Sequence, residues 1–181
     1  MNLPSSDNEL ALALGHVVIA WGTLQEILGH VFSAILCEEM SEIALAAWHC
    51  HKNDRAQREM LKATAQARLA TRLDLCKYVT DLANKSNNMA DFRNDLVHAS
   101  YASVSQEDAT VVYIPHSYYG NPRSKKLDIQ FAEGGLVEAL TKFRNQIIEI
   151  IKEAEEAYQC LVNPERTPLR GIRQWQYPKP T

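Results

Sequence analysis

The sequence predicts a mainly α protein, an antiparallel bundle of four to five helices with a small β-hairpin or three-stranded insert. Apolar residues recur three and four positions apart over long segments, which is the spacing of a buried helix face. Alternating apolar and polar residues, typical of strands, occur only between about 100 and 132. We expect one helical domain over 1–162, with the insert inside it, and a Pro-rich basic tail over 163–181.

Composition supports a single domain with a sizeable core, because 46% of the 181 residues are hydrophobic. The net charge of −3 argues against a protein coated in basic residues, although it leaves room for a local basic surface. Four cysteines without a C-x-x-C pair indicate reduced thiols and a cytoplasmic location. The N-terminus lacks the basic region of a signal peptide, and the uncharged run 10–25 is short, so we expect no membrane segment.

The first helix is expected to begin near residue 7, since Ser6 and Glu9 form a capping box. Its apolar residues alternate three and four apart through four heptads. They are Leu10, Leu14, Val17, Trp21, Leu24, Leu28, Val31 and Ile35. A short second helix over 42–51 ends in Trp-His-Cys-His, but residues one and two apart point to different sides of a helix. We therefore expect a packed Trp48, no metal site and no cofactor.

A third helix should run from Asn53 or Asp54 to about Ala83. It carries an excess of basic residues, among them Arg68 and Arg72, which form either a solvated face or a track for RNA phosphates. The polar run 84–88 reads as a break, after which a separate helix would begin at residue 86 or 87.

The pattern changes after Tyr101. Residues 102–114 read as a β-hairpin, residues 126–131 as a third strand, and 136–161 as the last long helix. The loop 115–122 and the residues that follow it carry aromatic and basic side chains that could stack on bases and contact phosphates, or simply be exposed. These are Tyr118, Tyr119, Arg123, Lys125 and Lys126.

Residues suited to phosphate chemistry gather in the stretch 91–101. Arg93 is a cation, Asn94 both donates and accepts hydrogen bonds, and His98 titrates near neutral pH. On an ideal helix Asn94 and His98 lie about 40° apart, whereas Arg93 and His98 lie about 140° apart. Arg93 and His98 would thus share a phosphate most readily if a second copy of the helix contributed one of them.

The segment Arg93-Asn94-x-x-x-His98 resembles the R-x(4–6)-H signature of the HEPN superfamily, the higher eukaryotes and prokaryotes nucleotide-binding domains. The resemblance implies a HEPN-like helical bundle and a homodimer. Many members are metal-independent endoribonucleases, often toxins or phage-defence effectors, so an antitoxin or regulatory protein is an implied partner. By this resemblance RNA is the substrate and Arg93, Asn94 and His98 are catalytic.

A non-catalytic reading remains open. Arg93 could pair with Asp91 or Asp95 of its own helix, and His98 could lie at a helix C-terminus, where its protonated form is favourable. In that case the protein would be a non-catalytic HEPN-like dimer that binds RNA, a nucleotide or a partner protein.

Overall fold

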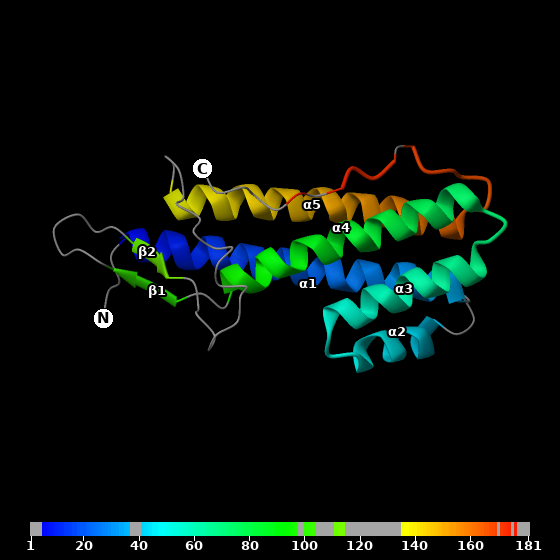
Figure 1. Cartoon of the computed structure of the whole chain (residues 1–181), viewed down its shortest axis with the longest axis horizontal. Helices are drawn as coiled ribbons and strands as arrows, with labels where there is room; N and C mark the ends of the chain where they lie inside the picture. The colour runs from blue at the N-terminus through cyan, green and yellow to red at the C-terminus, as the bar shows by residue number, and fades with distance from the viewer. Residues whose placement is uncertain are drawn as a thin grey trace.

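The computed structural model consists mainly of helices, which confirms the predicted helical bundle (Figure 1). It describes residues 5–36, 41–97, 100–103, 111–114, 135–169, 171–174 and 176. Within these residues the helices are α1 (Ser5–Leu36), α2 (Ser41–Cys50), α3 (Asp54–Arg68), α4 (Leu73–Val97) and α5 (Gly135–Val162).

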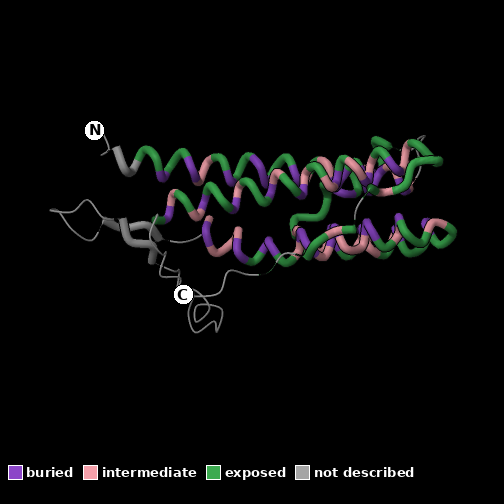
Figure 2. Tube along the Cα trace, turned by 90° about the horizontal axis from the view of Figure 1, so that it is seen from above, coloured by how far each residue is buried: buried purple, intermediate pink, exposed green. Residues whose placement is uncertain are grey.

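The core lies along α1, which packs lengthwise against α5 and also touches α2, α3 and α4 (Figures 1 and 2). The apolar seam predicted for α1 is confirmed, because seven of its eight residues are buried and Leu14 is partly buried. On α5, Leu140, Phe143, Ile147 and Ile150 are buried opposite this seam. By length and composition α1 could also cross a membrane, a test that core helices of soluble bundles pass as well.

The short helix α2 packs against α1 through Trp48, whose side chain is fully buried, as expected. Its ring lies 5.6 Å from the ring of Phe32 and directly over Gly29. A Cβ atom at Gly29 would lie 2.9 Å from Cδ1 of Trp48, so only glycine lets the two helices approach this closely.

The predicted division between the third and fourth helices is wrong. The chain turns at residues 69–72, and α4 then continues without interruption through the polar run 84–88. At the turn, the amide of Arg72 donates to the carbonyl of Leu69 over 2.9 Å. The Arg72 guanidinium donates to the carbonyls of Cys160 and Arg166, at 2.8 and 3.0 Å. These long-range bonds stabilise a turn that contains neither glycine nor proline.

The polar run stays helical because its side chains have partners inside the bundle. The Lys85 ammonium lies 2.7 Å from the Glu153 carboxylate of α5. The Ser86 hydroxyl accepts a hydrogen bond of 2.7 Å from Nε of Arg58 in α3. A run of polar residues indicates a loop when its side chains must form hydrogen bonds with water. Here groups on α3 and α5 supply the partners instead.

Strands β1 (Ser100–Ser103) and β2 (Val111–Ile114) follow α4 and pair antiparallel, with Tyr101 opposite Tyr113. The third strand expected over 126–131 lies outside the described residues, as does the loop 115–122.

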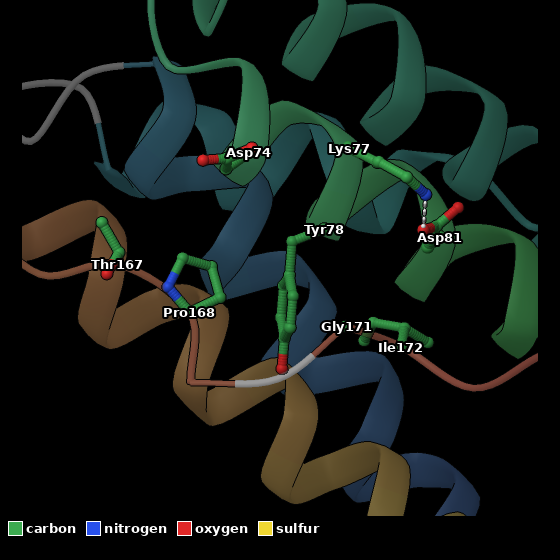
Figure 3. A pocket seen from close by; sticks show the side chains of 8 residues that line it. All are labelled: Asp74, Lys77, Tyr78, Asp81, Thr167, Pro168, Gly171 and Ile172. Carbon is green, nitrogen blue, oxygen red and sulfur yellow. Dashed lines mark hydrogen bonds and ion pairs between the residues drawn. The ribbon is translucent and has the colours of Figure 1, made fainter.

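The described part of the C-terminal tail runs along α4 and α5. The Gln174 amide donates to the carbonyl of Asp81 over 3.0 Å, and Arg166 pairs with Glu156. Between the tail and α4 lies a cavity of about 330 Å³, shown in Figure 3, with the Tyr78 ring in its wall. The Tyr78 hydroxyl donates to the carbonyl of Glu153 over 3.3 Å.

Replacing Gly29 by Ala should destabilise the protein by about 1–3 kcal/mol, because the new methyl group overlaps the Trp48 ring. Gly22→Ala in the same helix is the matched control, since nothing lies within 4 Å of its added Cβ. It should be neutral or stabilising by up to about 1 kcal/mol, because alanine favours the helix. Urea unfolding followed by circular dichroism measures both changes, and equal effects at the two glycines would contradict the close contact.

Tyr78 should ionise only in strongly alkaline solution. Burial, followed by the nearby Glu153, Glu156 and Cys160, raises the pKa of Tyr78 from 10.0 to about 12. Because the folded pKa exceeds the unfolded one, this group's contribution to stability is complete below pH 10 and disappears as the pH rises through about 12. The ultraviolet titration difference between wild type and Tyr78→Phe should show one tyrosine with the raised pKa in folded protein. If the signal lost in Tyr78→Phe belongs to a tyrosine that titrates near pH 10, Tyr78 is not buried beside these acidic groups.

Candidate functional site

A polar cavity of about 590 Å³ lies between the N-terminal turn of α3 and the second half of α4. Arg93 and Asn94 of the predicted motif both line it. The other lining residues are Lys52, Asn53, Asp54, Arg55, Asn87, Ala90 and Asp91. We call this cavity the α3–α4 pocket. His98, the third motif residue, lies outside the described residues, one residue beyond the end of α4.

The rim on the α3 side is formed by a capped helix start. Asn53 has extended backbone angles, and its side-chain oxygen accepts a hydrogen bond of 2.9 Å from the amide of Arg55. Lys52 and Arg55 flank this cap and are exposed. The positive end of the α3 dipole and two cationic side chains therefore lie at the same side of the pocket.

Arg93 is held by three neighbours in a half-buried position. Its Nη1 donates to Oδ1 of Asn94 over 2.7 Å, and its Nη2 lies 3.7 Å from Oδ2 of Asp54. The guanidinium carbon is 5.3 Å from the centroid of the Trp21 ring, a cation–π distance. Its side chain keeps 24% of its surface exposed, so it borders both the core and the pocket.

Asp54 is the acidic centre of a cluster that joins three helices. Its Oδ2 accepts a hydrogen bond of 3.0 Å from the indole N–H of Trp21 in α1. The same oxygen lies 3.8 Å from Nη1 of Arg58. Gln25 lies beside them. With its amide oxygen oriented toward Arg58, this oxygen accepts a hydrogen bond of 2.6 Å from Nη2 of Arg58.

Arg58 is the most unusual residue of this cluster, because its guanidinium is fully buried. Its carbon lies 5.1 Å from the Trp21 centroid, and its Nε donates to Ser86. Burial lowers the pKa of Arg58 to about 10, Asp54 opposes this change, and Arg93 lowers the pKa further. Arg58 thus remains charged at neutral pH.

The cluster carries more positive than negative charge. Among the described residues, ion pairs join both Arg58 and Arg93 to one carboxylate, that of Asp54. The carboxylate of Asp91 also lines the pocket, as do the cations Lys52 and Arg55, so pocket and cluster together carry four basic and two acidic side chains. An anionic ligand at Arg93 would balance this excess.

The other basic residues predicted to bind RNA do not join this pocket. Arg68 and Arg72 lie at the opposite end of α3, about 20 Å along the helix from its start. Arg68 donates to the carbonyl of Leu36, and Arg72 bonds two carbonyls of the α5 end. The predicted loop residues lie outside the described part of the chain: Tyr118, Tyr119, Arg123, Lys125 and Lys126.

Sequence reasoning missed Trp21, Asp54 and Arg58 as parts of the site. Asp54 and Arg58 are four apart just after a helix cap, which is a local signal for an ion pair. Nothing local indicates that this pair meets Trp21 or Arg93, which are distant in sequence. In the parts that the structure describes, His, Cys, Asp and Glu form no group of three able to hold a metal ion.

Asp54→Asn should destabilise the fold by about 1–3 kcal/mol, because it leaves Arg58 and Arg93 without their shared counter-charge. The cost stays below that of breaking a fully buried pair, since Asp54 is 31% exposed. Asp91→Asn, an exposed change in the same pocket, should stay within about 0.5 kcal/mol. Denaturant unfolding compares the two, and equal stabilities would show that Asp54 is not the cluster's centre.

Comparison with protein-family models, with curated proteins and with solved structures finds no match for this chain. The residues of the α3–α4 pocket and of the motif are therefore what points to a function.

Proposed function

We propose that this protein is a HEPN-like, metal-independent endoribonuclease. The observation that carries the proposal is the location of Arg93 and Asn94 in one pocket, beside a cluster with excess positive charge. A phosphodiester is an anion that an arginine binds well, and Arg55, Lys52 and the start of α3 add attraction at the rim.

RNA supplies its own nucleophile, so the protein needs proton transfer and anion stabilisation. In the proposed reaction the 2′-oxygen attacks phosphorus and the bond to the 5′-oxygen breaks, giving a 2′,3′-cyclic phosphate and a 5′-hydroxyl. His98 takes the proton from the 2′-hydroxyl or gives one to the leaving 5′-oxygen. Arg93 stabilises the charge that develops on the phosphate, and Asn94 orients Arg93 through their hydrogen bond.

We further propose that the enzyme works as a homodimer in the cytoplasm. The outer face of α1 exposes Leu12, Val18 and Ile19, with 60%, 51% and 68% of their surfaces accessible. Leu12 and Ile19 are seven residues apart and share one face of the helix, and exposed apolar side chains there favour burial against another chain. In the proposed dimer, His98 of one chain would act together with Arg93 of the other, which the angular separation of the two residues on one helix favours.

A non-catalytic protein that binds RNA, a nucleotide or a partner is the second candidate. It is favoured by one observation, the ion pair between Arg93 and Asp54, which partners the cation within the fold.

Purified protein incubated with mixed cellular RNA in EDTA should leave 2′,3′-cyclic phosphate ends. Arg93→Ala and His98→Ala should each reduce cleavage by at least about 100-fold, the usual loss for a proton-transfer or charge-stabilising group. Arg144→Ala is the matched control, because Arg144 also precedes an asparagine on a long helix but lies outside the pocket. Cleavage that survives both motif substitutions would contradict the proposal, whereas RNA binding without cleavage would favour the second candidate.

A further inference from the structure

The Trp21 side chain contacts every charged member of the cluster. The guanidinium carbons of Arg58 and Arg93 lie 5.1 and 5.3 Å from its ring centroid, and its N–H donates to Asp54 over 3.0 Å. Trp21 is only 2% exposed and is fixed in the core of α1. A rigid ring therefore defines where these three charges can lie.

The distances around Asp54 differ in a way that matters for a ligand. The indole bond at 3.0 Å is a hydrogen bond, whereas the separation of 3.7 Å from Arg93 is an ion pair longer than a hydrogen bond. Arg58 also attracts the same oxygen, from 3.8 Å. Asp54 thus attracts Arg93 without neutralising it, because its charge is divided between two cations.

We propose that Trp21 and Asp54 are positioning residues for Arg93, which orient its guanidinium at the α3–α4 pocket and leave it able to bind a phosphodiester. The inference rests on the proposed function for the ligand, but the orientation of Arg93 is a property of the free protein. An arginine restrained before binding loses less conformational entropy when it meets the anion. Arg58 is a second, fully buried cation beside Asp54, so the charge of this carboxylate is divided between Arg58 and Arg93.

The test observes Arg93 directly in full-length protein by NMR of its Nε–Hε group, assigned by loss of the signal in Arg93→Lys. In wild type this group should be ordered, exchange slowly with water and show a ring-current shift from Trp21. Trp21→Leu should abolish the shift and accelerate exchange about tenfold or more. Trp21→Phe should keep part of the shift, because a ring face remains while the N–H to Asp54 is lost.

A second variant and a reporter signal separate the positioning of Arg93 from a general loss of structure. Asp54→Asn keeps the side-chain shape and should also accelerate exchange at Arg93, so the test does not depend on a core substitution alone. Arg166, which bonds Glu156 far along the chain, reports folding and should be unchanged in each variant. Unchanged Arg93 signals in folded Trp21→Leu and Asp54→Asn would overturn the proposal.

A second arm measures binding of a short 2′-O-methyl RNA, which cannot be cleaved by 2′-oxygen attack, by fluorescence anisotropy. Folded Trp21→Leu should bind about fivefold to tenfold more weakly than wild type, approaching Arg93→Ala. If wild type does not bind while Arg93 still loosens in the variants, the proposed function fails and the positioning role stands. If affinity is unchanged although Arg93 loosens, orientation does not serve binding and the inference is wrong.

Discussion

The bundle is organised around one buried charge, the guanidinium of Arg58. Burying an unpaired cation would cost several kcal/mol, so it requires partners from all sides. They come from three helices: Trp21 of α1, Asp54 of α3 itself and Ser86 of α4. These contacts to Arg58 thus join α1, α3 and α4, and the hydrogen bond to Ser86 lies in the part of α4 that the sequence had suggested was a break.

The pocket follows from this arrangement. Because α4 is continuous, Arg93 lies two turns beyond Ser86 on the same side and reaches the same tryptophan. Because α3 begins at Asp54, directly after the Asn53 cap, its capped end meets this part of α4. The motif arginine is therefore placed by contacts that also stabilise the core, and this links the proposed chemistry to the fold.

The fold was predictable where burial follows local periodicity. The heptads of α1 identify its buried face, because this helix buries one continuous side. The boundary between α3 and α4 was not predictable in the same way. Residues 84–88 look like a loop because they are polar. They remain helical because Lys85 pairs with Glu153 and Ser86 with Arg58, and these partners are distant in sequence. The true turn is stabilised by Arg72 bonds to the end of α5, which no local pattern reveals.

The candidate site was predictable only as far as its motif. Arg93 and Asn94 are recognisable from spacing and chemistry. The alternative partners that the sequence suggested for Arg93, Asp91 or Asp95, lie on its own helix, whereas its ion pair with Asp54 of α3 comes from tertiary structure. Trp21 enters through tertiary packing alone. Sequence spacing identifies groups on one element, whereas a composite electrostatic cluster depends on how elements meet.

The most direct test of the account is to map RNA binding on the protein by amide chemical shifts during titration with uncleavable RNA. The proposed phosphate site in the α3–α4 pocket predicts shifts concentrated at the cap of α3 and along α4 near Asn87 and Asn94, and predicts that added salt weakens them. Shifts confined to the Arg72 end of the bundle or to the tail cavity, or no shifts at all, would contradict it.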